Sequence, residues 1–173
     1  NDNLAFAYEN LGRYDEAEKA VQSALDRKLE MPDFLERRYR LAFHRGDEAG
    51  KAREVALGRG NSGAEDMLYD MQAFTAAYHG RLHEARTHAQ RAVNLARETN
   101  HDERAALYQA GSALREAFLG YPAEARAAAA TALHFSRNRE VAYGVAFALA
   151  PGTSITLDVC CMAAVRLVTS DGG

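Results

Sequence analysis

The feature that most constrains this chain is the regular spacing of its glycines. Gly12, Gly46 and Gly80 are each 34 residues apart, and Gly120 follows 40 residues after Gly80. An interval of this length is typical of helical repeats, in which one supersecondary unit cannot bury its apolar face alone and stacks on its neighbours. We therefore expect the chain to fold as a row of stacked units.

Alanines recur at fixed distances from three of these glycines. They stand seven residues before, five after and twelve after the glycine: Ala5, Ala17 and Ala24; Ala73, Ala85 and Ala92; Ala113, Ala125 and Ala132. Small side chains let two helix axes approach closely. The recurring alanines therefore predict helix crossings rather than solvated surface.

The second copy of the pattern is degenerate. Tyr39, Lys51 and Gly58 occupy its three alanine positions. Ala52 and Ala56 lie close enough to suggest that the second helix of this copy has slipped in register.

Each glycine is expected to join two antiparallel helices. Apolar residues recur at helical spacing on both sides of Gly12. Glycine ends a helix readily, because it adopts the left-handed backbone conformation without steric strain. The pattern therefore predicts an all-α fold built from helix pairs.

Boundary signals agree with this pairing. Asp33, Ser62 and Asn100 are each followed three residues later by glutamate, which is typical of helix N-caps. Pro32 and Pro122 suit the first positions of helices. The predicted helices are 2–11, 14–29, 33–45, 48–57, 63–79, 82–98, 102–119, 122–137 and 139–150.

The residues around three of the glycines resemble the tetratricopeptide repeat family. The likeness rests on Leu-Ala-x-x-Tyr-x-x-x-Gly-Arg-Tyr-Asp-Glu-Ala (4–17), Tyr-His-Gly-Arg-Leu-His-Glu-Ala (78–85) and Phe-Leu-Gly-Tyr-Pro-Ala-Glu-Ala (118–125). It implies a right-handed α-solenoid of about four repeats plus a terminal helix over residues 1–150. Because a helical pattern is already running at Leu4, we expect this domain to be a fragment of a longer chain.

Residues 151–173 differ in character from the repeats. They begin with Pro-Gly, are rich in β-branched residues and lack the glycine–alanine offsets. We expect a poorly ordered, non-repeat tail. It would be either a divergent cap or, as we favour, the product of a frameshift or contig end.

Composition argues against several classes of partner. The net charge of −3 offers no basic stripe for nucleic acid or for an anionic membrane surface. No window is apolar enough to span a membrane, and the adjacent Cys160 and Cys161 cannot staple distant parts of a fold. The sequence predicts a cytoplasmic segment without disulfides that binds neither nucleic acid nor membrane.

Motifs that could carry chemistry are weak. Gly58-Arg-Gly-Asn-Ser-Gly63 matches a dinucleotide-binding pattern but follows a predicted helix instead of a strand. His79, His83 and His88 are interrupted by a helix-breaking glycine, and no cysteine or carboxylate completes a metal-binding set. We expect no catalytic residue, no cofactor and no metal, and hence no enzymatic activity in this segment.

The family's geometry implies that the first helix of each pair lines a concave groove, where a protein or peptide would bind. The candidate groove residues are Phe6, Arg40, Phe43, His44, Phe74, Tyr78, Leu114 and Phe118. Aromatic anchors are the residues that most often carry the binding energy of such surfaces. Packing between the repeats is the equally weighted alternative for each of these side chains.

Stretches at 39–56, 63–68, 75–82, 113–117 and 140–146 resemble a narrower group. They are similar to the C-terminal repeat regions of bacterial, acidobacterial-type eukaryotic-like serine/threonine protein kinases. That resemblance implies a docking or sensing region for signal transduction, in a parent protein that is possibly membrane-anchored. The alternatives are the repeat region of a transcriptional regulator or signalling ATPase, or a free-standing scaffold.

Overall fold

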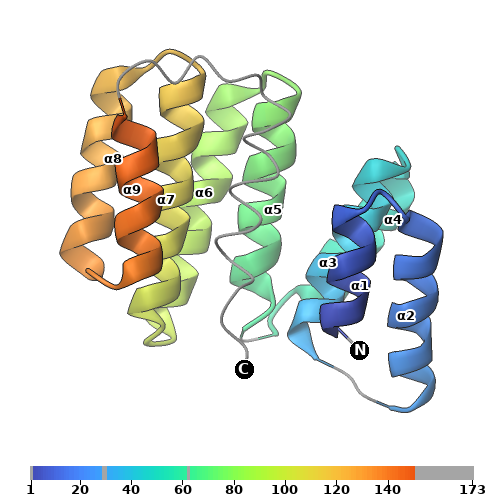
Figure 1. Cartoon of the computed structure of the whole chain (residues 1–173). Coiled ribbons are helices and arrows are strands. Elements are labelled where there is room, and N and C mark those ends of the chain that lie inside the picture. The colour runs from blue at the N-terminus through green and yellow to red at the C-terminus, as the bar shows by residue number, and fades with distance from the viewer. Residues whose placement is uncertain (1, 29–30, 62, 151–173) are drawn as a thin grey trace. The chain divides into compact units, whose positions relative to one another are not determined.

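The chain is all-helical throughout the part that the computed structural model describes, residues 2–28, 31–61 and 63–150. Nine helices follow one another in this part, packed in consecutive antiparallel pairs (Figure 1). They are α1 (Asp2–Asn10), α2 (Tyr14–Asp26), α3 (Pro32–His44), α4 (Glu48–Gly58), α5 (Glu65–Tyr78), α6 (Leu82–Glu98), α7 (Asp102–Phe118), α8 (Pro122–Phe135) and α9 (Arg139–Leu149). The predicted helices are confirmed, with ends that differ by three residues at most.

Four glycines turn the chain within the helix pairs. Gly12, Gly46, Gly80 and Gly120 have φ values of 71°, 67°, 74° and 84°. At the first turn the Gly12 N–H donates to the Glu9 carbonyl and the Arg13 N–H donates to the Tyr8 carbonyl, and the same pattern recurs at the other three. These bonds satisfy the last carbonyls of the preceding helix, as in a Schellman motif. The predicted role of the glycines is confirmed.

The predicted N-caps are less accurate. Asn100 has a φ of 59° and ends the turn after α6, so that His101 precedes α7. Asp33 lies inside α3, because Pro32 already occupies a first-turn position, and Ser62 lies outside the described residues. Side-chain caps are made instead by Asp47, which accepts from the Gly50 N–H at 2.8 Å, and by Asn138 before α9.

The chain divides into two compact units, residues 1–71 and 72–173. In the first unit α1 packs on α2, α3 packs on α4, and α3 also contacts both α1 and α2. Ala5, Ala17 and Ala24 are completely buried at the first crossing, where Phe34 and Leu41 of α3 cover them. The first part of α5 adds Leu68 and Met71 to a cluster with Tyr39.

The degenerate second copy keeps the register of the others. Tyr39, Lys51 and Gly58 are buried, whereas Ala52 and Ala56 are exposed. The suggested slip is therefore wrong. The buried aliphatic stem of Lys51 takes the place of an alanine, while its ammonium group pairs with Glu48 at 2.7 Å.

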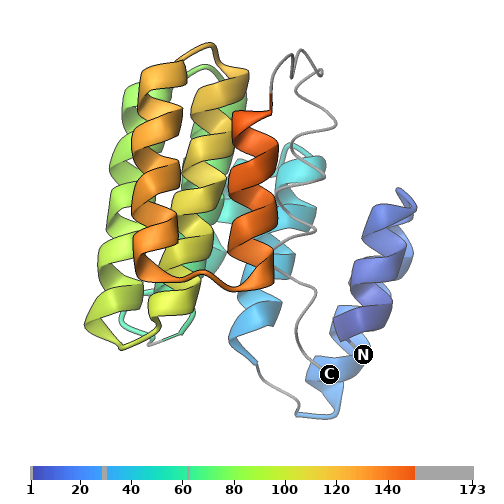
Figure 2. The same cartoon turned by 60° about the vertical axis from the view of Figure 1, so that its left-hand side comes forward.

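The second unit continues the pattern along α6 to α9. α6 packs on α7, α7 on α8, and α9 contacts both α7 and α8 (Figure 2). Ala113, Ala129 and Ala132 are buried with Leu114 and Val141 in the core between α7, α8 and α9. The alanines around Gly80 and Gly120 are 0–3% exposed, as predicted.

No helix in the described ranges is both long and apolar enough to cross a membrane. The continuous right-handed solenoid stays a prediction. Residues 151–173, for which we expected a poorly ordered tail, lie outside the described part of the chain.

Candidate functional site

A cluster of charged side chains is buried between α1 and α3. Arg37 and Arg40 of α3 both donate to Oε2 of Glu9 on α1, and the Arg40 Nη2 to Glu9 Oε2 distance is 2.7 Å. Arg40 Nη1 lies 3.3 Å from Oε1 of Glu36, one helical turn away. The exposed fractions of these four side chains are only 4–8%. Buried charges usually mark a constraint beyond packing, because removing them from water is costly.

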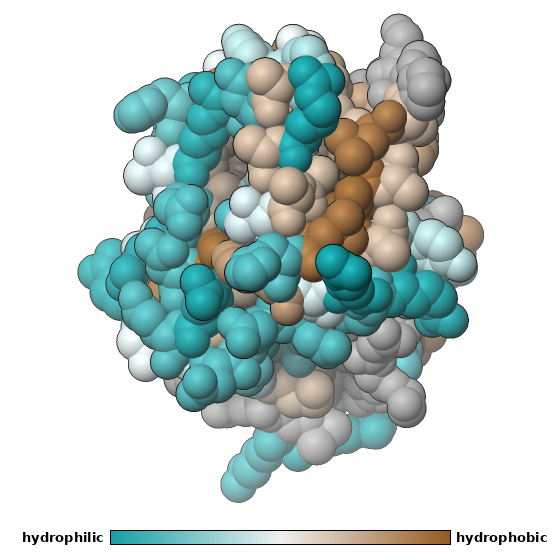
Figure 3. Space-filling view, turned by 90° about the vertical axis from the view of Figure 1, so that its left-hand side faces the viewer, coloured by the Kyte–Doolittle hydropathy of each residue, from teal (hydrophilic) through white to brown (hydrophobic). Residues whose placement is uncertain are grey.

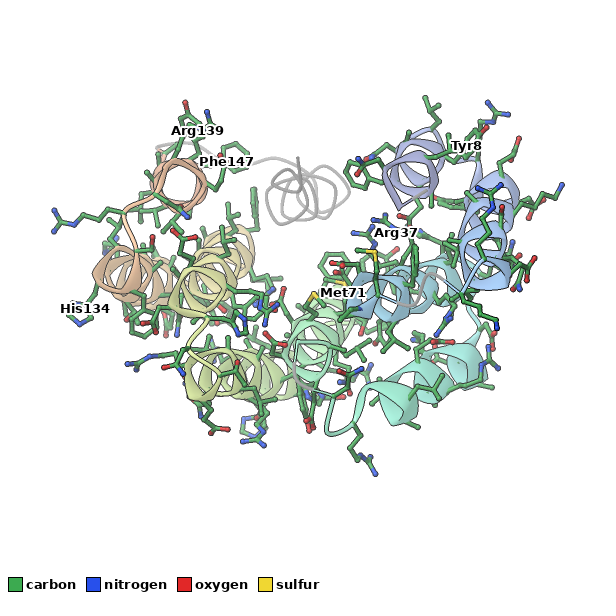
Figure 4. All side chains as sticks on the ribbon, turned by 90° about the horizontal axis from the view of Figure 1, so that it is seen from below. Tyr8, Arg37, Met71, His134, Arg139 and Phe147 are labelled. Carbon is green, nitrogen blue, oxygen red and sulfur yellow. The ribbon has the colours of Figure 1, made fainter. Side chains whose placement is uncertain are left out.

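The helical period of α3 explains this arrangement. Residues three and four apart share a helix face, so Arg40 stands beside both Glu36 and Arg37. Phe6 lies one turn before Glu9 on α1, and the Arg37 guanidinium lies over its ring at 5.4 Å from the centroid. Figure 4 shows Arg37 extending from α3 toward the side on which α1 lies.

The cluster is incompletely hydrogen-bonded. Glu9 Oε1 and Arg40 Nη1 are both buried without a hydrogen-bond partner. Arg40 Nη1 and Glu36 Oε1 are near enough for an ion pair, but no hydrogen bond joins them. An unpaired buried polar atom costs stability unless a water molecule or another group supplies the missing hydrogen bond.

Burial also changes the acidity of this cluster. Loss of water raises the pKa of the Glu36 carboxyl above its ordinary value, and Asp33 and Asp70 act in the same direction. Arg40 and Arg37 oppose this change by favouring the carboxylate. Groups with shifted pKa values concentrate at functional sites, although ion pairs with a structural role show them too.

Two candidate groove residues lie at the end of α3. The His44 ring is stacked on Tyr14, with the ring centroids 4.5 Å apart, and Phe43 is half-buried beside it. Lost hydration lowers the pKa of His44, with Arg40 acting in the same direction and Glu9 against it. The charges of Glu9 and Arg40 therefore both act on His44, whereas Phe6 joins this cluster through its contact with Arg37.

The other four candidates lie in the second unit. Tyr78 is 46% exposed and Phe74 is half-buried, both on the last turns of α5. Leu114 is 3% exposed and belongs to the core. Phe118 packs on Phe147 of α9, with ring centroids 5.9 Å apart. Leu114 therefore packs in the core instead of lining a groove, whereas Tyr78 presents its ring to solvent.

The last helix carries an apolar face. Tyr143 is 60% and Leu149 is 45% exposed, and Ala142 and Ala146 are exposed as well. No charged residue occurs from 141 to 150. Figure 3, which views the molecule from the side of α8 and α9, shows an apolar band bordered by hydrophilic residues.

The sequence argument missed Arg37. Two arginines three residues apart in a helix with apolar neighbours were the available signal, since they must share a face. Sequence cannot reveal that both reach the same glutamate 28 and 31 residues earlier.

Comparisons with protein-family models, with curated proteins and with solved structures give no significant match for this chain. Within the described ranges no three His, Cys, Asp or Glu side chains are grouped so that they could hold a metal ion.

Proposed function

We propose that the chain is a protein-binding module of the tetratricopeptide repeat type. The observation that carries this proposal is the set of four equivalent glycine turns, three of which are followed by a helix with buried alanines at the same offsets. Such units present one helix of each pair to a partner. The described part of the chain shows no charged cluster arranged for metal-assisted chemistry, and the repeat pattern itself favours recognition.

In each unit a binding face would be made by the first helices of the pairs. In the first unit these are α1 and α3, which hold Phe6, Glu9 and Arg40 together. In the second unit Tyr78 and Phe118 offer aromatic surface. A few aromatic and arginine anchors would supply most of the affinity for a peptide or a partner helix.

The resemblance to bacterial kinase repeat regions suggests the cellular role. We infer that the module docks a protein partner for an N-terminal serine/threonine kinase domain of the same polypeptide. The gene sequence upstream of residue 1 tests this inference. A kinase glycine-rich loop and catalytic loop would support it, whereas a DNA-binding domain, a nucleotide-binding domain or an immediate start codon would contradict it.

The binding role is tested by a matched set of surface variants. Peptides selected by display against the whole chain are titrated calorimetrically against wild type, Phe6→Ala, Tyr78→Ala and Leu57→Ala. Leu57 is 56% exposed but lies on α4, a second helix, and is the control. We expect Phe6→Ala or Tyr78→Ala to weaken binding about tenfold or more while helicity is retained, because anchors of this kind contribute about 2 kcal/mol or more. Equal affinity of all four proteins would contradict the proposed face.

A further inference from the structure

The second unit contains a pocket of about 140 Å³, lined by α6, by α7 and by the end of α5. α6 and α7 lie side by side (Figure 1). The apolar wall of the pocket consists of Ala77, Leu82, Ala85 and Ala89, of which the three alanines are buried. Leu82, Ala85 and Ala89 recur at helical spacing and therefore share one face of α6. Because alanine side chains are short, they leave this space open between the helices.

The polar part of the pocket carries more positive than negative charge. Arg86 donates through Nε and Nη2 to the two carboxylate oxygens of Glu116, both at 2.7 Å. The Arg86 guanidinium carbon also lies 5.0 Å from the centroid of the Tyr121 ring, so this side chain is held from two sides. Arg115 lines the pocket as well. Two guanidinium groups and one carboxylate give the lining a net charge of +1.

Hydrogen-bond donors of the pocket are held in place. Arg115 Nη2 donates to the Ser112 hydroxyl at 3.0 Å, which positions its guanidinium along α7. Arg86 Nη1 takes no part in the pair with Glu116. The Gln109 side chain is half-buried, and within the part of the chain that the structure describes no hydrogen bond engages its carboxamide. An anionic group in the pocket would therefore meet donors that are already oriented.

We propose that this pocket binds a small monocarboxylic acid whose apolar body is about as large as a six-membered ring. The volume sets the size, because an apolar cavity of about 150 Å³ can hold benzene. The body would contact Leu82 and the alanines. The carboxylate would accept from Arg115, from Gln109 Nε2 and from Arg86 Nη1. This inference goes beyond the proposed protein-binding face, since it assigns a small-molecule site between α6 and α7.

Other ligands fit the pocket less well. A neutral ligand would gain nothing from the net positive charge of the lining, and a dicarboxylate would bring a second negative charge toward Glu116. Acetate would satisfy the donors but leave most of the apolar wall in contact with water. The C-terminal residue of a peptide carries the same carboxylate, but its main-chain amide would compete with the apolar body for the same space.

The test titrates the full chain with benzoate, benzamide, acetate and N-acetyl-glycyl-valine. Binding is followed through the side-chain N–H₂ signals of Gln109 in ¹H–¹⁵N spectra. We expect a saturable shift with benzoate. The affinity should be about tenfold weaker or more for benzamide, which lacks the charge, and for acetate, which lacks the ring. No saturable shift with benzoate, or equal affinity for benzoate and benzamide, would overturn the proposal. Tighter binding of N-acetyl-glycyl-valine would overturn it in favour of a peptide C-terminus.

Variants locate the bound acid. Ala89→Met extends a flexible side chain into the pocket and should abolish the benzoate-dependent shift. Arg115→Gln removes one positive charge of the lining and should weaken benzoate binding about tenfold or more. Arg126→Gln makes the same chemical change at an exposed position of α8 outside the pocket and should bind as wild type does. Retained binding in Ala89→Met, or equal affinity of the two arginine variants, would overturn the proposal. If a pocket variant does not fold, the comparison of benzoate with benzamide on wild type decides.

Discussion

Gly50 occupies a position that leaves no room for a side chain, although it lies in the first turn of a regular helix. An added Cβ would stand 2.8 Å from Asp47 Cγ and 3.0 Å from Ala42 Cβ. Asp47 is the N-cap of α4 and accepts from the Gly50 N–H. Gly50→Ala would therefore force the capping carboxylate away and press α4 against α3.

Gly111 provides a matched control within α7. A Cβ there would meet only Arg115 Nη1, at the ordinary contact distance of 3.6 Å. Gly111→Ala therefore makes the same chemical change without the steric conflict. Both glycines are helical, so alanine brings each helix a comparable gain in propensity of about 1 kcal/mol.

The two variants should move the free energy of unfolding in opposite directions. At Gly111 the propensity gain stands alone, and we expect stabilisation by about 1 kcal/mol. At Gly50 the lost cap costs about 1 kcal/mol and overpacking costs about 1–3 kcal/mol. These costs exceed the gain, so we expect net destabilisation by about 1–3 kcal/mol.

Urea denaturation followed by far-ultraviolet circular dichroism measures both effects. A lower midpoint with an unchanged slope is expected for Gly50→Ala, and a higher midpoint for Gly111→Ala. If Gly50→Ala stabilised the chain as much as Gly111→Ala does, the close approach of α3 and α4 at this residue would be refuted.

Three further outcomes follow from burial and charge. Ala92→Leu should lower the free energy of unfolding by about 1–3 kcal/mol, because Ala92 is completely buried. Ala52→Leu, on the exposed face of α4, should change it by no more than about 0.5 kcal/mol. Equal losses of stability in thermal denaturation would contradict the assigned buried and exposed positions. Because burial raises the pKa of Glu36, this side chain stabilises the fold below its ordinary pKa of 4.5, and that stabilisation is lost as pH rises through the pKa of the folded state. Glu36→Gln should therefore be more stable than wild type at pH 7 and should lose this advantage in acid. Because the pKa of His44 is lowered, this side chain stabilises the fold above pH 6.5, and that stabilisation is lost as pH falls through the pKa of the folded state. In His44→Gln the free energy of unfolding should therefore decrease less between pH 6.5 and more acidic pH than it does in wild type. An unchanged pH dependence would contradict the lowered pKa of His44.

The sequence determined the helices and their pairing. The glycine interval and the alanine offsets predicted the nine described helices and the left-handed turns at Gly12, Gly46, Gly80 and Gly120. These features are readable because a helix period, a left-handed glycine and a small residue at a crossing are local requirements of the backbone. The buried state of the repeated alanines follows from the same local pattern.

Local signals failed where neighbouring elements decided the outcome. The second copy was expected to slip toward Ala52 and Ala56, yet Lys51 is buried, because its ammonium group finds Glu48 and lies 5.6 Å from the centroid of the Phe43 ring. Asn100 was expected to cap α7 but instead takes a left-handed conformation, as Lys28 does after α2 and glycine does in the turns within the helix pairs. The burial of Lys51 depends on which side chains lie nearby after the helices have packed.

The candidate site was likewise predicted in part from the sequence and decided in part by how the helices pack. The resemblance to the tetratricopeptide repeat family placed Phe6, Arg40 and His44 on the first helices of the pairs, where a groove was expected. It did not foresee that Arg37 and Arg40 converge on one oxygen of Glu9 and leave Glu9 Oε1 and Arg40 Nη1 unpaired. Hydrogen bonds between residues about thirty positions apart depend on how α1 and α3 dock, and only the tertiary structure sets that distance.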